Sequence, residues 1–340
     1  MLRILQVGVG GYGSTWLDTV TARPGQATYA GLIDVDDRAL TAAATQTGVP
    51  AERCFHSLAE ALGHVEADAV LCVVPPAVHE SVIVPALEAG MHVLTEKPIA
   101  HSLEATRRIV EAGRASPGLL MISQKGRYHP WVRRFRELIA ANELGRLNHV
   151  TLHYRYGLFQ WGASGFRHRM DDPLLVEMSI HHFDLLRALL GRNALSVAGR
   201  SWNWDWSGFA GDVAASLVFA MEDEVPAVYE GNCVSAGEPT SWYGDIRAEC
   251  ERGTLTMRYP RLIMQRRRDE PMQGGEHVMD VTEPQVGQAA AFAEFLAAIA
   301  ERRAPETAAA DNQHSMAMLF AAVEACHTGA SCSTERYLGV

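Results

Sequence analysis

The chain has 340 residues, 48% of them hydrophobic and 21% charged, which is typical of about two globular domains with ordinary cores. Its formal net charge of −10 argues against nucleic acid and anionic membrane surfaces as partners. The six cysteines are scattered, and no apolar run reaches the about 18 residues that a membrane span needs. We therefore expect a cytoplasmic protein with reduced thiols.

The first apolar run enters a turn with three glycines in the spacing G-x-G-x-x-G, at Gly8, Gly10 and Gly13. A buried strand that turns directly into a helix near Tyr12 would bring its backbone close to a pyrophosphate at the helix N-terminus. The next apolar run contains Asp34, 21 residues after Gly13, where an acidic residue holds an adenosine ribose. The two features together predict a bound nicotinamide dinucleotide. A Rossmann scaffold without a nucleotide is the alternative.

Asp34 also indicates which dinucleotide is bound. A carboxylate at this position repels a 2′-phosphate, and no basic residue is placed to receive one. The sequence therefore favours NAD over NADP.

Residues 1–123 alternate apolar runs with amphipathic segments, which predicts a parallel sheet covered by helices. We expect strands over 69–74, 92–95 and 119–123 and helices over 14–22, 38–47, 57–65 and 79–89, with another helix capped by Ser102. Ligands bind outside the carboxyl ends of such strands. The candidate cofactor-binding residues are therefore Gly8, Gly10, Tyr12, Gly13, Asp34, Val74, Pro75, His79, Glu96 and Lys97.

The pattern changes in residues 124–340. We expect helices over 130–141, 174–190, 288–301 and 312–328, and strands over 147–156, 196–206, 213–221, 225–234, 243–250, 254–258 and 262–267. Short turn-like links between these strands indicate a mostly antiparallel sheet. The strand over 196–206 would carry three tryptophans on one face, in the core or in a dimer interface: Trp202, Trp204 and Trp206.

Lys97 follows the strand over 92–95 and precedes Pro98. Hydride transfer between an alcohol carbon and nicotinamide needs a base for the hydroxyl proton and a cation or donor for the alkoxide. Burial would lower the pKa of this lysine toward the working pH. We interpret Lys97 as a catalytic residue; a surface lysine in a loop is the alternative.

A second candidate group lies on the helix over 174–190, where Glu177 and His181 are one helical turn apart and Asp184 is three residues further. A carboxylate beside an imidazole can orient it and raise its basicity. The alternatives are a polar cluster that fixes the helix to the sheet and a metal site. No thiolate or further histidine joins the group at ligand spacing, so we expect no metal. His182 would point away, as a core histidine.

With these residues the chain resembles the Gfo/Idh/MocA family, which includes glucose–fructose oxidoreductase and inositol dehydrogenase. The resemblance spans the chain and rests on the glycine motif, Asp34, the segment Pro75–His79, Glu96-Lys97-Pro98 and the helix with His181. It implies an α/β protein with an NAD-binding Rossmann domain, 1–123, and a substrate-binding and dimerisation domain with an open-faced sheet, 124–340. It also implies NAD(P)-dependent oxidation or reduction of a sugar, polyol or related cyclic compound by a homodimer or homotetramer.

The resemblance places Lys97 and His181 at the family's catalytic lysine and histidine. The family's first acid is aspartate, whereas this chain has Glu177. The longer side chain moves the carboxylate, so Glu177 is a catalytic residue or only orients His181. At the mouth of the pocket we expect substrate contacts from Arg127, Trp161 and Arg167, besides His181. The alternative functions are a hydrolase or lyase that recycles its NAD within one turnover, and a catalytically silent NAD-binding protein.

Overall fold

The computed structural model describes residues 1–157, 165–267, 276–279, 281 and 286–338. The chain divides into two compact units. The first unit contains residues 1–125 and the later segment that ends at Gln313, and the second contains the segment that begins at Gly126 and residues 314–338.

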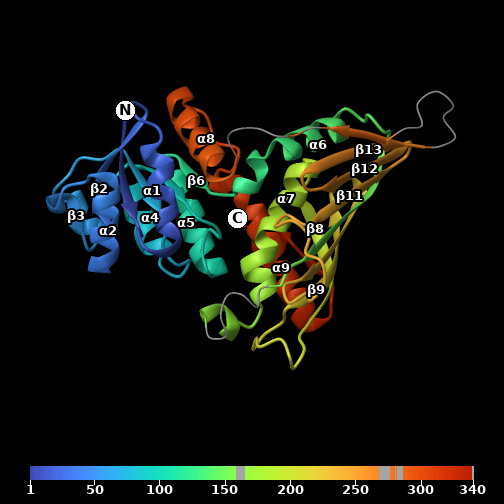
Figure 1. The fold of residues 1–340 in the computed structure, drawn as a ribbon. Coiled ribbons are helices and arrows are strands. Elements are labelled where there is room, and N and C mark those ends of the chain that lie inside the picture. Colours follow the sequence, from blue (N-terminus) through green and yellow to red (C-terminus); the bar gives the residue numbers. More distant parts are fainter. Residues whose placement is uncertain (158–164, 268–275, 280, 282–285, 339–340) are drawn as a thin grey trace. The chain divides into compact units, whose positions relative to one another are not determined.

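The first unit is built on a six-stranded parallel sheet with the strand order β3-β2-β1-β4-β5-β6 (Figure 1). Its strands are β1 (Leu2–Val7), β2 (Ala27–Ile33), β3 (Cys54–Phe55), β4 (Ala69–Cys72), β5 (His92–Thr95) and β6 (Leu120–Ile122). Its helices are α1 (Ser14–Thr21), α2 (Asp37–Thr47), α3 (Leu58–Leu62), α4 (His79–Glu88), α5 (Leu103–Ala115) and α8 (Gln288–Glu301). The expected doubly wound parallel sheet is confirmed.

Side-chain caps start the helices of this unit as their sequences suggest. The Asp36 carboxylate accepts a hydrogen bond from the backbone of Arg38 before α2, and the Ser102 hydroxyl accepts one from Ala105 before α5. These caps end each connection at a fixed residue.

The strand order reverses between β1 and β4, which pair with each other from Ile4–Ala69 to Val7–Cys72. At such a switch point the loops after the two strands leave in opposite directions and open a crevice, and open α/β sheets bind their ligands there. The glycine turn after β1 therefore lies at the expected ligand edge.

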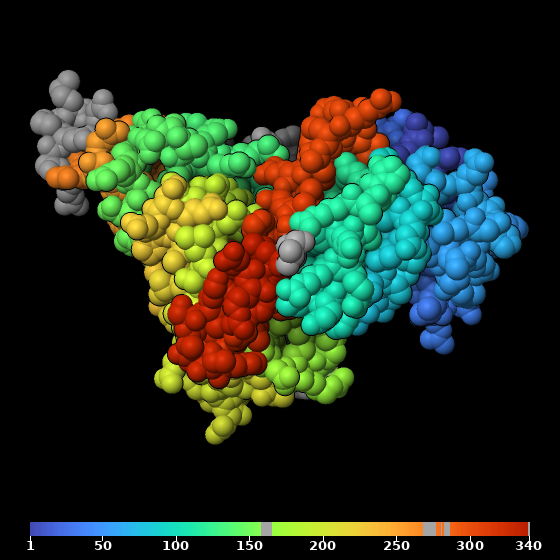
Figure 2. Space-filling model, turned by 180° about the vertical axis from the view of Figure 1, so that it is seen from behind, coloured from blue at the N-terminus to red at the C-terminus, as the bar shows by residue number. Residues whose placement is uncertain are grey.

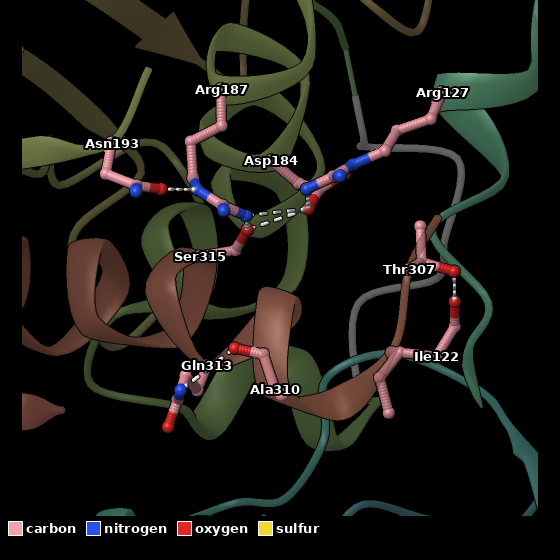
Figure 3. Close-up of polar contacts among 9 residues, drawn as sticks. All are labelled: Ile122, Arg127, Asp184, Arg187, Asn193, Thr307, Ala310, Gln313 and Ser315. Carbon is pink, nitrogen blue, oxygen red and sulfur yellow. Dashed lines mark hydrogen bonds and ion pairs between the residues drawn. The ribbon is translucent and has the colours of Figure 1, made fainter. Parts of the chain in front are cut away.

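A segment near the C-terminus returns to the first unit. The Thr307 hydroxyl donates to the carbonyl of Ile122 at 2.6 Å, and the Ile122 amide donates to the carbonyl of Thr307 at 2.9 Å (Figure 3). Seen from behind, the orange-red surface of this segment lies against the teal surface of α5, where Arg114 donates to Gln313 (Figure 2). These contacts extend the edge of the sheet at β6.

The second unit contains a nine-stranded sheet with the order β14-β13-β12-β11-β7-β10-β9-β8-β15. Its strands are β7 (Leu147–Arg155), β8 (Ala194–Trp202), β9 (Ala214–Met221), β10 (Pro226–Asn232), β11 (Asp245–Cys250), β12 (Gly253–Arg258), β13 (Arg261–Arg266), β14 (Glu276–Met279) and β15 (Cys332–Ser333). Only the β7–β10 pair is parallel among the pairs described, so the expected mostly antiparallel sheet is confirmed.

Helix α7 (Ile180–Leu190) and the later part of α9 (Ala309–Thr328) lie on one face of this sheet, and α6 (Pro130–Ala140) packs on α7 (Figure 1). In the part of the chain that the structure describes, Figure 1 shows no helix on the opposite face.

The expectation of three tryptophans on one strand is wrong. Strand β8 ends at Trp202, and residues 204–207 form a turn in which the Ser207 amide donates to the carbonyl of Trp204. The Asn203 side chain causes the break, because its amide donates to the carbonyl of Phe209 and its oxygen accepts from the Trp204 amide. The Trp204 and Trp206 rings instead stack, with centroids 5.3 Å apart.

The helix expected over 174–190 is not a continuous α-helix. Residues Leu174–Ser179 form a π-helical segment, and α7 begins at Ile180. A π turn takes one more residue than an α turn, so the side chains before and after it no longer follow the i, i+4 relation. The spacing argument that placed Glu177 and His181 on one face therefore does not hold.

We predict that Gly13→Ala lowers the free energy of unfolding by about 3 kcal/mol, because a Cβ there would lie 2.2 Å from the carbonyl oxygen of Gly8. Gly11→Ala is the matched control, since its Cβ would meet nothing within 4 Å. Its positive φ of 49° should cost about 1 kcal/mol. Urea unfolding measures both, and equal losses would contradict the close approach of the two glycines.

Candidate active site at the strand ends

The glycine turn after β1 leaves no room for side chains. Gly8 has a φ of +86°, and a Cβ there would lie 2.3 Å from the carbonyl oxygen of Val73. Only glycine combines this conformation with this contact. At Gly11, by contrast, a Cβ would meet no atom within 4 Å. The turn is thus packed tightly against the β4 loop at Gly8, whereas its backbone is open at Gly11.

Gln6 holds this turn from below and is a residue that the sequence analysis missed. Its side chain is fully buried, and its amide nitrogen donates to the carbonyls of Gly8 at 3.0 Å and Gly13 at 2.8 Å. Its oxygen accepts from the hydroxyl of Tyr29 at 2.7 Å. A polar residue just before the first glycine is the signal that could have revealed it.

Asp34 follows β2 and reaches back over the same turn. One carboxylate oxygen accepts from the backbone amides of Val9 at 2.9 Å and Gly10 at 3.1 Å, and the other accepts from Asp36. The carboxylate therefore lies beside the glycine turn, as a ribose-binding acid must. The turn fits an adenine dinucleotide: its backbone is open at Gly11, a Cβ is excluded at Gly8 and Gly13, and Asp34 lies beside it.

Glu96 and Lys97 follow β5 at the same edge. The Glu96 carboxylate is 7% exposed and accepts from the Trp16 indole and from the Lys97 backbone amide, each at 3.2 Å. Burial raises the pKa of this carboxyl, while the charges of Lys125 and Lys97 oppose that shift. The loop that carries Lys97 is thus attached to α1 through Glu96 and Trp16.

His79 joins the loops that follow β4 and β5. It is fully buried, and its ring nitrogens lie 3.0 Å from the carbonyls of Ile99 and Val74. Burial lowers its pKa. We propose that His79 positions these two loops, because carbonyls occupy both sides of its ring. In the loop after β4, Val74 is half-buried and Pro75 is exposed.

In the second unit, the structure brings Glu177 together with Arg167. The Arg167 guanidinium lies 3.0 Å from the Glu177 carboxylate, with side-chain exposures of 37% and 10%. Arg167 also lies 4.5 Å from the centroid of the Phe166 ring. A half-exposed arginine therefore compensates the charge of the nearly buried Glu177.

His181 is 8% exposed, and its ring lies 6.3 Å from that of Trp242. Tyr156 packs edge-on against the same indole at 5.7 Å. Both aromatic residues are half-buried and were not among the sequence candidates. They form an aromatic wall beside the candidate histidine.

His182 is the core histidine that its spacing predicted. It is fully buried, and its Nε2 lies 3.0 Å from the carbonyl of Trp242. A carbonyl only accepts, so Nε2 donates, and Nδ1 accepts from the hydroxyl of Tyr229 at 3.1 Å. His182 thereby fixes the backbone of the residue that packs beside His181.

Asp184 and Arg127 form a buried ion pair (Figure 3). Nε and Nη2 of Arg127 each donate to Asp184 at 2.7 Å, and the exposed fractions of the two side chains are 6% and 2%. The Ser315 hydroxyl donates to Asp184, and Arg187 donates to Ser315 and Asn193. Arg127 thus attaches α7 to the segment before α6, and its expected contact with substrate stays a prediction.

Trp161 lies outside the described residues. Within the described ranges, no group of three or more His, Cys, Asp or Glu side chains is arranged to hold a metal ion. No helix among those residues is long and apolar enough to cross a membrane.

Two family models match the chain. The model described as "Oxidoreductase family, NAD-binding Rossmann fold" matches residues 2–124, and the "GFO/IDH/MocA C-terminal domain" matches residues 132–256. The fold, the glycine turn and the two family matches together define an NAD(P)-dependent oxidoreductase. The chain belongs to the Gfo/Idh/MocA family, as its motifs predicted, and NAD is its cofactor.

Three similar proteins illustrate the relationship. The uncharacterized protein y4oX of Sinorhizobium fredii (strain NBRC 101917 / NGR234) is 31% identical over 99% of this chain and 96% of its own length. Inositol 2-dehydrogenase of Corynebacterium glutamicum (strain R) is 32% identical over 58% of this chain and 56% of its own. A crystal structure of an Agrobacterium radiobacter oxidoreductase, in complex with NAD+, L-tartaric acid and magnesium, shares the fold with a TM-score of 0.88, 16% identity and 99% coverage of both chains.

We predict that His182 makes the protein less stable in mild acid. Burial lowers its pKa from 6.5 to about 4, so the unfolded chain binds a proton first as the pH falls. Stability is then lost from about pH 6.5 downwards, by about 2 kcal/mol between pH 7 and 5. Urea unfolding at the two pH values should show this loss in the wild type and in His64→Gln, an exposed control, but reduced by that amount in His182→Gln. An equal loss in all three would contradict the assignment.

Proposed function

We propose that the protein transfers a hydride between NAD and the CH–OH carbon of a sugar, polyol or related cyclic compound. The observation that carries the proposal is the position of Lys97 at the carboxyl edge of the NAD-binding sheet, in a loop attached through Glu96 and His79. The inositol 2-dehydrogenase relative supports a cyclic polyol as the substrate class. We propose residues 1–123 as the NAD-binding domain and 124–340 as the substrate domain, with the segment 286–313 returning to the first unit.

Lys97 and His181 have acid–base roles in this proposal. Bound NAD+ would supply the hydride acceptor for this chemistry, and bound NADH the hydride donor. His181 takes the hydroxyl proton from the substrate, and the Lys97 ammonium stabilises the oxygen as its negative charge develops. In the reductive direction the protonated His181 returns the proton to the oxygen, and the Lys97 ammonium stabilises that oxygen until the proton arrives.

We assign Glu177 a positioning role. The carboxylate faces the Arg167 guanidinium at 3.0 Å, and the ion pair holds both side chains at the start of the segment that leads to His181. The longer side chain of glutamate, compared with the family's aspartate, suits this reach to Arg167. Arg167 is half-exposed, and we propose that it also contacts substrate hydroxyls.

The aromatic wall beside His181 suits a ring-shaped substrate. The faces of Trp242 and Tyr156 offer apolar surface for the CH groups of a sugar or cyclic polyol, while His181 offers a polar contact to a hydroxyl. Binding sites of this kind combine apolar contact area with a few fixed polar groups. A flat, hydroxylated ring fits that combination.

The proposal predicts NADH formation when the protein is incubated with NAD+ and a panel of cyclic polyols and sugars. Lys97→Met should lower kcat by about 10²- to 10³-fold, because removing one preorganised donor from the developing oxyanion costs that much. NADH affinity should stay within a few-fold of the wild type. Arg134→Met, which removes an exposed cation on α6, should keep full activity. Wild-type turnover by Lys97→Met would refute the role of Lys97.

A further inference from the structure

The chain contains only two lysines, Lys97 and Lys125, whereas its other basic side chains besides histidine are all arginines. Lys97 follows β5 and Lys125 follows β6, and these two strands pair in parallel from Val93–Leu120 to Thr95–Ile122. Both ammonium groups are therefore carried by the loops at the carboxyl edge of the NAD-binding sheet. Lys97 is accounted for by the proposed chemistry, and Lys125 is not.

Lys125 contacts the glycine turn. Its Nζ lies 2.5 Å from the hydroxyl oxygen of Tyr12 and 5.0 Å from the centroid of the Tyr12 ring. Tyr12 is 47% exposed and belongs to the turn between Gly10 and Gly13. In the sheet, β4 and β5 separate β1 from β6, so this contact reaches across the carboxyl ends of those two strands.

Charges at this edge leave a role for a second cation. Two acidic side chains, Asp34 and Glu96, lie at this edge. The charge of Lys125 lowers the pKa of Glu96 more strongly than the charge of Lys97 does. A dinucleotide adds two negative phosphates at the glycine turn, where the amino end of α1 supplies only partial positive charge. An ammonium held at Tyr12 is within reach of those phosphates and is mobile enough to turn toward them.

We propose that Lys125 is a cofactor-binding residue: its ammonium, held over the glycine turn by Tyr12, pairs with the pyrophosphate of NAD. Tyr12 acts as its support through the phenol hydroxyl. The proposal rests on NAD binding and not on the proposed hydride chemistry. If Lys125 does not bind the pyrophosphate, the proposed role of Lys97 still stands. If Lys97 has no role in hydride transfer, the proposed role of Lys125 still stands.

Binding of ADP-ribose tests the pairing, because this fragment has the pyrophosphate and lacks the nicotinamide. In calorimetry, Lys125→Met should weaken ADP-ribose and NADH by a similar factor of about 10 to 100, the value of a charge-assisted contact. Lys125→Arg should restore most of the affinity. Arg108→Met, which removes a cation on α5 that pairs with Glu80 of α4, should bind as the wild type does. Thermal unfolding without ligand checks that each variant is folded.

The composition of the chain allows a second, independent readout. An amine-selective acetylating reagent can modify only Lys97, Lys125 and the N-terminal amine. Mass spectrometry of the wild type should show that saturating ADP-ribose protects Lys125. Equal acetylation of Lys125 with and without ADP-ribose, or unchanged affinity in Lys125→Met, would overturn the proposal.

Discussion

The candidate cofactor site depends on one buried amide. Gln6 lies in the apolar strand β1, and its side chain donates to the carbonyls of Gly8 and Gly13 while it accepts from Tyr29. Leaving a buried amide group unpaired costs about 1–3 kcal/mol, so these contacts tie the strand to one conformation of the turn. That conformation brings Gly13 against Gly8, and it directs the amides of Val9 and Gly10 toward Asp34.

The sheet topology then gathers further groups at the same edge. Because all six strands are parallel, the loops after β1, β2, β4, β5 and β6 leave from one side. Polar side chains that are buried there have structural tasks: His79 joins two loops, and Glu96 anchors the backbone of Lys97. In the second unit, the Arg127–Asp184 pair and His182 do the same for α7 and Trp242. The candidate reactive groups, Lys97 and His181, lie next to such anchors in sequence.

The sequence predicted the fold class and the glycine turn because both are local patterns. Continuous apolar runs alternate with helical segments, and the spacing of Gly8, Gly10 and Gly13 is set by close backbone contacts. Gln6 was missed because a single polar residue in an apolar strand has no periodicity. The partner of Asp184 was missed because Arg127 lies 57 residues away in the chain.

Two errors have local physical causes. Alternating tryptophans suggested one strand, but the Asn203 side chain bonds to the backbone and ends β8 before Trp204. The π-helical segment before α7 was missed because most of its residues are buried, so the segment shows no amphipathic period that an extra residue could disturb. Trp242 and Tyr156 were missed because only the folded sheet brings them beside His181.

The central claim is that the protein moves a hydride between a CH–OH carbon and NAD. It is tested most directly with a substrate from the polyol and sugar panel that carries deuterium on the reacting carbon. Mass spectrometry and NMR of the cofactor after one turnover with NAD+ should find the deuterium on the nicotinamide ring, with the ketone as product. A product that retains the deuterium, or has it returned while no net NADH accumulates, would contradict net hydride transfer.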